Sequence, residues 1–294
     1  MDIFRGSGVA IITPMKDDGT VNYDKLEELI NFHIDNGTDS IIICGTTGES
    51  ATLSMEEHRK VIAETVRFAK GRIPIIAGTG SNATETAIQL STEAEEDGAD
   101  ALLVVTPYYN KATQSGLIRH YSAIADAVKL PIIVYSVPSR TGTNVLPETM
   151  AALLREKENI VGLKEATGNM AQAVRTMYLT DGKLQMFSGE DGLVVPLMSI
   201  GAIGVISVLA NIAPQQTHDM CQAFFDGDVQ KAAQMQIAAE PLVDALFSEV
   251  NPIPVKKALN LMGKEVGPLR PPLYEMEENN AKKLEEEMRR FGVL

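Results

Sequence analysis

Ser40-Ile41-Ile42-Ile43-Cys44 contains three consecutive isoleucines, so this stretch is apolar on both faces of an extended chain. Leu102-Leu103-Val104-Val105 has the same character further along the sequence. Successive side chains of a strand point to opposite faces, so runs of this kind predict strands that are covered on both sides. Such strands are typical of parallel sheets whose faces carry helices.

Short apolar runs of this type alternate with helix-like segments through most of the chain. The candidate strands are Gly8–Thr13, Ser40–Cys44, Ile73–Gly78, Ala101–Thr106, Pro131–Tyr135, Ile160–Glu165, Leu184–Ser188 and Gly204–Ser207. The candidate helices are Asp24–Asn36, Met55–Lys70, Thr84–Asp97, Gln114–Val128, Pro147–Lys157, Met170–Leu179, Leu193–Ile200 and Pro214–Asp226. The spacing between most strands is about thirty residues, which fits repeated βαβ units.

Local sequence signals support these boundaries. Ser54-Met55-Glu56-Glu57 has the pattern of a capping box that starts the second helix, and Asn82 with Glu85 is a similar pattern before the third. Asn36-Gly37 and Asp97-Gly98 are expected to end helices, where a left-handed residue is needed.

Eight βα units predict a TIM (β/α)8 barrel. An open, doubly wound sheet is the alternative, but no G-x-G-x-x-G motif follows the first strand and no Walker A sequence is present. After Asp226 the pattern changes to three helices without intervening strands, at Asp228–Phe247, Pro254–Met262 and Glu277–Phe291. We therefore expect a catalytic barrel over residues 1–226 and a C-terminal three-helix appendage over residues 227–294.

Composition narrows the classes of function. The formal net charge of −13 argues against nucleic acid or an anionic membrane as the main partner, because both attract clustered Lys and Arg. No apolar run reaches membrane-spanning length, and the N-terminus lacks a signal-peptide pattern. We expect a cytoplasmic protein in which Cys44 and Cys221 are reduced thiols. The four histidines are scattered, so no metal site is predicted.

In a TIM barrel the functional site lies at the carboxyl ends of the strands. The residues that follow these ends are polar: Gly45-Thr46-Thr47-Gly48-Glu49-Ser50, Thr106-Pro107-Tyr108-Tyr109-Asn110, Tyr135-Ser136-Val137-Pro138-Ser139-Arg140, Lys164-Glu165, and Ser188-Gly189-Glu190-Asp191. Each has an ordinary alternative, such as a turn, a surface charge, or a lysine that reaches solvent from a strand end. Their shared position at one rim favours a functional site.

The residue types at this rim predict chemistry on a carbonyl compound. Burial lowers the pKa of a lysine, and a neutral amine can attack a ketone to form an imine. Lys164 is the candidate amine, and Tyr135 is the strand-end hydroxyl that could move protons. Arg140 can bind a carboxylate through two hydrogen bonds.

Three motifs resemble the dihydrodipicolinate synthase family, within the pyruvate-dependent class I aldolases. They are Gly45-Thr46-Thr47-Gly48-Glu49, the segment from Tyr135 to Gly142, and Gly162-Leu163-Lys164-Glu165. The resemblance extends from Gly8 to the C-terminal helices. It implies condensation of pyruvate with L-aspartate 4-semialdehyde on the diaminopimelate route to lysine. No metal or organic cofactor is implied, and the expected assembly is a homotetramer, a dimer of tight dimers.

The resemblance also implies roles for individual residues. Lys164 corresponds to the lysine that holds pyruvate as a Schiff base, and Tyr135 to the proton-transfer tyrosine. Thr47 and Tyr109 correspond to its relay partners, with Tyr109 reaching a neighbouring subunit's site. The implied substrate-binding positions are Thr46 at the pyruvate carboxylate, Arg140 at the semialdehyde carboxylate, and Gly189 and Ile206 beside the lysine.

Two departures from the family pattern are visible. Ser136 stands where the family commonly has asparagine. The lysine-effector site of sensitive members is matched in part, by Ser50, Ala51, His58, Asn82 and Tyr108. However, Met55 replaces a common histidine, and Thr86 replaces the glutamate that holds the effector's amine. An ammonium without a carboxylate partner binds poorly, so we expect weak or absent inhibition by lysine.

Two other functions remain open at this point. One is another pyruvate-dependent aldolase, acting on N-acetylneuraminate or a keto-deoxy sugar acid. The other is a non-catalytic barrel that serves as a binding or regulatory subunit. The Thr46-Thr47 pair together with Arg140 favours the synthase, because an arginine suits a short substrate that bears a carboxylate.

Overall fold

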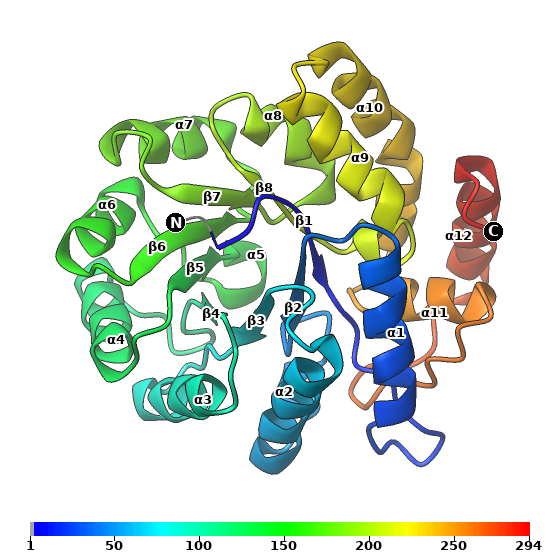
Figure 1. Cartoon of the computed structure of the whole chain (residues 1–294), viewed down its shortest axis with the longest axis horizontal. Helices are drawn as coiled ribbons and strands as arrows, with labels where there is room; N and C mark the ends of the chain where they lie inside the picture. Colours follow the sequence, from blue (N-terminus) through cyan, green and yellow to red (C-terminus); the bar gives the residue numbers. More distant parts are fainter. Residues whose placement is uncertain (1–2) are drawn as a thin grey trace.

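The computed structural model describes residues 3–294 and contains a closed barrel of parallel strands in chain order (Figure 1). The strands are β1 (Gly6–Ala10), β2 (Ser40–Ile43), β3 (Ile75–Gly78), β4 (Ala101–Val105), β5 (Ile132–Ser136), β6 (Ile160–Glu165), β7 (Gln185–Ser188) and β8 (Gly204–Ser207). β1 also pairs with β8, which closes the ring. The predicted TIM barrel is confirmed.

Helices follow the strands and surround the barrel. They are α1 (Tyr23–Asp35), α2 (Met55–Ala69), α3 (Thr84–Glu96), α4 (Gln114–Ala127), α6 (Pro147–Glu156), α7 (Met170–Leu179), α8 (Val194–Met198) and α9 (Pro214–Phe225). The sequence did not predict the short helix α5 (Pro138–Thr141) or the 3-10 turns η1 (Ser50–Thr52), η2 (Asp191–Leu193) and η3 (Leu209–Asn211). All four of these short segments lie directly at the carboxyl ends of strands or in the loops that follow them.

The first strand begins and ends earlier than the predicted Gly8–Thr13. The backbone N–H of Ile12 donates to the side chain of Asn211 at 3.2 Å, and the Thr13 hydroxyl donates to the Gly48 carbonyl at 2.7 Å. The Asn211 side chain thus takes the place of a strand partner at Ile12, and the strand stops at Ala10 although the sequence remains apolar.

One of the two predicted capping boxes is confirmed. The Ser54 hydroxyl accepts from the Glu57 N–H, and the Glu57 carboxylate accepts from the Ser54 N–H. The prediction of a capping box at Asn82 was wrong, because the N-cap of α3 is Ala83, whose side chain makes no capping hydrogen bond. The Asn82 amide instead donates to the carbonyl of Tyr108 at 3.2 Å, which joins two loops at the rim.

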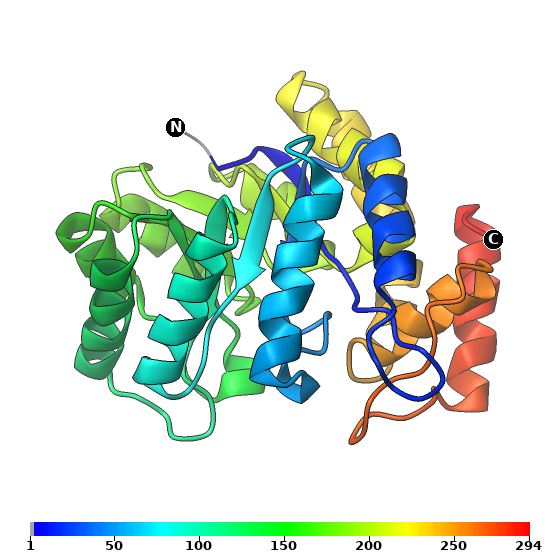
Figure 2. The ribbon, with the colours of Figure 1, turned by 60° about the horizontal axis from the view of Figure 1, so that its bottom comes forward.

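Three further helices follow the barrel, α10 (Val229–Leu246), α11 (Ile253–Leu261) and α12 (Glu278–Phe291). In both ribbon views α11 and α12 lie at one edge of the molecule, beyond α1 (Figures 1 and 2). The larger hydrophobic cluster, which contains residues of both the strands and the surrounding helices, continues into these three helices through Leu242, Leu259 and Leu284. Their division from the barrel at residue 226 remains a prediction, since this apolar core crosses that boundary.

A second hydrophobic cluster fills the barrel interior. The rings of Phe4 and Phe187 stack there with centroids 4.4 Å apart. Ile42, Leu103 and Ile133 belong to the same cluster, as does Tyr135. The interior is therefore packed beneath the site rather than hollow. No helix within residues 3–294 is both long and apolar enough to cross a membrane.

Candidate active site

Lys164 lies near the carboxyl end of β6, opposite Tyr135 in the register between β5 and β6. The residue is only 6% exposed. Its stem passes close to Gly189, where an added Cβ would lie 3.1 Å from Lys164 Cγ and 2.7 Å from the Ala166 side chain. Glycine at position 189 therefore leaves the space that the lysine side chain occupies.

The Lys164 amine is held in a low-polarity environment. Its Nζ lies over the Tyr135 ring, 4.3 Å from the centroid. Burial lowers the pKa of Lys164 to about 8; the negative charge of Asp191 opposes this shift and the positive charge of Arg140 adds to it. At pH 7 an amine of this pKa is neutral in roughly a tenth of the molecules, far more than an ordinary lysine. A nucleophilic amine is thus available near neutral pH.

Tyr135 provides a hydroxyl that stays protonated. Burial raises the pKa of Tyr135 to about 12, although Arg140 and a hydrogen bond with the Thr46 side chain lower it in part. Thr47, which the family resemblance placed in the relay, has a different contact: its hydroxyl accepts from the Asn251 amide at 2.9 Å. Thr46 and Tyr135 also line an adjoining cavity that Thr47 does not reach, so the threonine next to the Tyr135 hydroxyl is Thr46.

Most of the predicted site residues line one cavity of about 400 Å³. The predicted residues around it are Thr46, Thr47, Tyr135, Arg140, Lys164 and Gly189. Arg140 is exposed on α5, and its guanidinium donates to the Asn251 carbonyl at 3.3 Å. A cavity with one nucleophilic amine and one exposed guanidinium can bind a small keto acid and a second carboxylate.

Two predicted residues do not line this cavity in the single chain. Ile206 is buried within the barrel interior, in the same cluster as Tyr135. Tyr109 is 92% exposed and has a left-handed backbone with φ of 72°. Its side chain therefore projects from the rim rather than into the cavity of its own chain.

Comparison with known proteins agrees with this geometry. The sequence matches the Dihydrodipicolinate synthetase family (DHDPS) over residues 3–290. The chain belongs to this family. It is 58% identical to the 4-hydroxy-tetrahydrodipicolinate synthase of Lachnoclostridium phytofermentans, with the whole of both chains aligned.

Solved structures of the DHDPS family have the same fold. Dihydrodipicolinate synthase from Aquifex aeolicus is 46% identical with a TM-score of 0.96, and 99% of each chain is covered. The lysine-bound DHDPS of Cyanidioschyzon merolae is 38% identical with a TM-score of 0.97, and both chains are covered completely.

Several polar residues at the cavity have no individual role predicted from the sequence, and Glu190, Asp191 and Asn251 are among them. Glu190 and Asp191 follow β7, and burial raises the pKa of both carboxyl groups. Asn251 comes from the segment between α10 and α11, 204 residues from its partner Thr47. No local pattern marks Asn251 as a site residue, because only the packing of the C-terminal helices brings it to the rim.

Ser136, where the family commonly has asparagine, connects two segments next to the site. Its buried hydroxyl accepts from the Val145 N–H at 3.2 Å and lies 3.3 Å from the Asn144 side-chain oxygen. Asn144 in turn donates to Gln172 at 2.7 Å. Ser136 therefore fixes the end of β5 to the loop behind α5, the helix that carries Arg140.

Among residues 3–294, no group of three or more His, Cys, Asp or Glu side chains is placed to hold a metal ion. The acidic residues of the cavity come from the segment after β7, which carries Glu190 and Asp191, and from α10, which carries Glu240 and Asp244.

Proposed function

We propose that the chain is a 4-hydroxy-tetrahydrodipicolinate synthase, a Schiff-base-forming lyase that condenses pyruvate with L-aspartate 4-semialdehyde. The observation that carries the proposal is the buried Lys164 amine with its lowered pKa, next to Tyr135 in a cavity that also contains Arg140. Membership of the DHDPS family and 58% identity to a synthase of this name support it.

The first half of the reaction uses pyruvate alone. The neutral Lys164 amine attacks the keto carbon, and loss of water leaves an iminium ion. The positive nitrogen withdraws electrons, so the methyl carbon loses a proton and an enamine forms. Tyr135, hydrogen-bonded to Thr46, is the proposed carrier of these protons.

The second half joins the two substrates. The enamine carbon attacks the aldehyde carbon, and the aldehyde oxygen takes up a proton. The amino group of the semialdehyde then attacks the former keto carbon, closes the ring and displaces Lys164. Arg140 is the proposed ligand of the second carboxylate. The iminium nitrogen accepts the electrons, so the proposed reaction needs no metal or organic cofactor.

The proposed assembly is a homotetramer built from two tight dimers. The 92% exposure of Tyr109 supports a role outside its own chain, in which the partner subunit's Tyr109 completes the proton relay. We propose that the protein acts in the cytoplasm, in the diaminopimelate pathway. Neither nucleic acid nor membrane is a proposed partner, in keeping with the net charge of −13.

Substrate turnover tests this proposal directly. The purified protein is expected to consume pyruvate with L-aspartate 4-semialdehyde, and to cleave N-acetylneuraminate or keto-deoxy sugar acids far more slowly. The presence of Arg140 at the cavity is the reason for this preference. Faster turnover of a sugar acid would assign the protein to the other aldolases, and no turnover of either class would favour a non-catalytic barrel.

The pH dependence of the pyruvate half-reaction should report the pKa of Lys164. Attack requires the neutral amine, so kcat/KM for pyruvate is expected to rise about tenfold per pH unit below the pKa, then level off near pH 8. If kcat/KM instead keeps rising up to a pKa near the ordinary lysine value of 10.5, the Lys164 amine is not desolvated.

We also propose that L-lysine is at most a weak inhibitor. Ser50, Ala51, His58 and Tyr108 line an adjoining cavity of about 470 Å³, together with Met55 and Thr86. The only carboxylate among the described lining residues is that of Glu49, and both of its oxygens are already hydrogen-bonded. No carboxylate there is free to bind the effector's ammonium.

Steady-state inhibition by lysine is the corresponding measurement. The native chain is expected to show little inhibition at sub-millimolar lysine, and Thr86→Glu should increase its sensitivity by supplying the absent carboxylate. Strong sub-millimolar inhibition of the native chain would contradict this expectation.

A further inference from the structure

The loop that carries Thr46 and Thr47 is bracketed by two residues in an unfavourable backbone conformation. Cys44 and Glu49 both have φ of 54°, in the left-handed region, although neither is glycine. Such a conformation is unfavourable for a residue with a side chain and persists only where the surrounding structure imposes it. The loop has backbone bonds of its own, from Gly48 N–H to the Gly45 carbonyl and from Glu49 N–H to the Thr46 carbonyl, each 3.1 Å long. We expect its surroundings to supply further restraint.

The C-terminal segment supplies that restraint through Glu49. Lys256, on α11, donates to Glu49 Oε1 at 2.7 Å, and the Arg270 N–H donates to Glu49 Oε2 at 2.9 Å. The two side chains of the ion pair are 2% and 1% exposed, so water does not screen it. Lys256 also donates to the Pro268 carbonyl at 2.6 Å.

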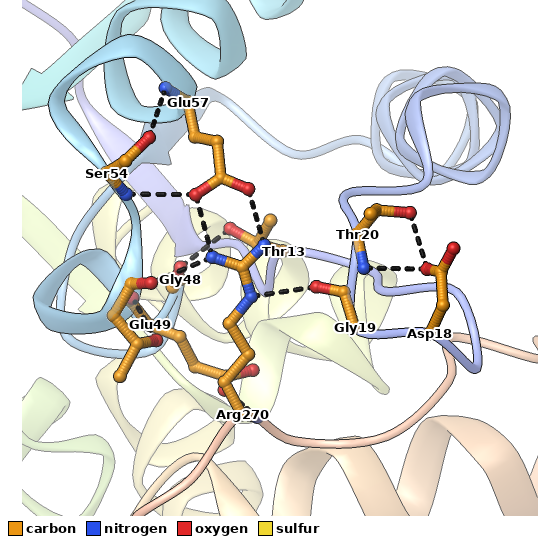
Figure 3. Close-up of polar contacts among 10 residues, drawn as sticks. Thr13, Asp18, Gly19, Thr20, Gly48, Glu49, Ser54, Glu57 and Arg270 are labelled. Atoms are coloured by element: carbon orange, nitrogen blue, oxygen red, sulfur yellow. Dashed lines mark hydrogen bonds and ion pairs between the residues drawn. The ribbon is translucent and has the colours of Figure 1, made fainter.

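Further contacts join the same two parts of the chain. The Arg270 guanidinium binds both carboxylate oxygens of Glu57, at 2.8 and 2.5 Å, and donates to the Gly19 carbonyl at 2.8 Å (Figure 3). It also donates to the Thr52 carbonyl at 2.8 Å. Asn251 donates to Thr47 at the other end of the loop. The loop is thus held from outside the barrel by three C-terminal residues, Asn251, Lys256 and Arg270.

We propose that the Glu49–Lys256 ion pair is a positioning device for catalysis: it holds the threonine loop in the strained conformation that places the Thr46 hydroxyl against Tyr135. Neither side chain needs to touch substrate. This inference depends on the proposed function, because the proton relay that it positions serves the pyruvate half-reaction. It assigns the C-terminal helices a part in the chemistry as well as in the fold.

A buried pair of this kind is not explained by stability alone. Desolvating two charges offsets much of their attraction, so replacing such a pair by apolar groups is often neutral for stability. Removal of one partner, by contrast, leaves an unpaired buried charge. The geometry links the pair instead to the loop conformation, since Glu49 is itself one of the two left-handed residues.

The test measures proton transfer separately from condensation. With pyruvate alone, exchange of its methyl protons for solvent deuterium requires Lys164, Tyr135 and their relay, but no second substrate. Lys256→Met removes the charge at similar volume, and Lys256→Arg retains it. Sodium borohydride trapping with pyruvate counts the chains whose Lys164 still forms the imine.

Rates are divided by the number of chains that borohydride traps with pyruvate. On this basis, Lys256→Met is expected to exchange methyl protons and to condense both substrates about 10- to 100-fold more slowly than the native chain. A loss of this size is typical when a reacting group is slightly misplaced. KM for pyruvate should change little, and Lys256→Arg should recover most of the rate. Equal rates per trapped chain in Lys256→Met, even with lower thermal stability, would overturn the proposal and leave the pair a purely structural feature.

A neutral double variant covers the case in which Lys256→Met fails to fold. Glu49→Gln with Lys256→Met leaves no unpaired buried charge, so it should fold, but the anchor of the loop is lost. Methyl-proton exchange is still expected to be slow, and full exchange activity would overturn the proposal. If the native chain exchanges methyl protons but does not turn over the semialdehyde, the proposed substrate is wrong while this test remains valid.

Discussion

Replacing Lys164 by methionine is expected to abolish turnover while the fold remains intact. Methionine matches the length of the buried stem but has no nucleophilic nitrogen, so no imine can form. The loss in kcat should exceed about 10⁴-fold, beyond the ~10²–10⁴-fold that a single general acid or base typically contributes. Circular dichroism and steady-state assays together measure fold and rate.

The matched control is Lys183→Met, at a lysine whose side chain is 77% exposed and remote from the cavity lining. This variant should retain the native rate. Residual activity above about one per cent in Lys164→Met would show that the reaction proceeds without a lysine imine.

Replacing Tyr135 by phenylalanine is expected to lower kcat by about 10²–10⁴-fold, the usual range for loss of a proton-transfer group. The ring that lies 4.3 Å from Lys164 Nζ remains, so the amine keeps its surroundings. Only the hydroxyl and its hydrogen bond with Thr46 are removed. Pyruvate should still be trapped on Lys164, but its methyl-proton exchange should be slow.

Tyr121→Phe provides the comparison, because Tyr121 is also fully buried and its hydroxyl donates to the Val104 carbonyl at 3.2 Å. Loss of this bond should lower stability by about 1 kcal/mol and leave kcat per folded chain unchanged. If Tyr135→Phe and Tyr121→Phe lose the same amount of kcat, Tyr135 has no specific role in proton transfer.

The barrel could be predicted because its signals are local. The apolar runs at Ile41–Ile43 and Leu102–Val105 lie in strands, and the Ser54–Glu57 capping box starts its helix as expected. The end of β1 could not be predicted, because the Ile12 N–H donates to the side chain of Asn211, about two hundred residues away in the sequence. Asn82 likewise bonds to a neighbouring loop rather than to its own helix.

The site residues also fall into two groups, those that local sequence signals predict and those that only long-range packing brings to the site. Lys164, Tyr135 and Arg140 lie at or just after strand ends, so a barrel predicted from the sequence places them at one rim, and all three line one cavity. Thr46 and Thr47 are adjacent, and sequence alone does not determine which hydroxyl meets Tyr135. Asn251 and Lys256 contact the threonine loop across more than two hundred residues, and only the packed C-terminal helices create those contacts.

Glu49 shows how a local sequence motif depends on contacts with distant parts of the chain. The sequence placed Glu49 in a motif where a hydrogen bond that orders the loop is the ordinary expectation, and its carboxylate binds Lys256 and the Arg270 backbone N–H. The loop conformation near Thr46 is therefore determined by residues of α11 and the segment after it. A barrel truncated before these residues would retain Lys164 but lose the restraints on its proton relay.

Borohydride reduction in the presence of pyruvate tests the central claim most directly. The account predicts one reduced pyruvate per chain, located on Lys164 by peptide mass spectrometry, with no adduct in Lys164→Met. It also predicts that labelling becomes faster as the pH approaches 8, where the amine loses its proton. The absence of an adduct, or an adduct on a different lysine such as Lys256, would contradict the assignment of Lys164 as the nucleophile.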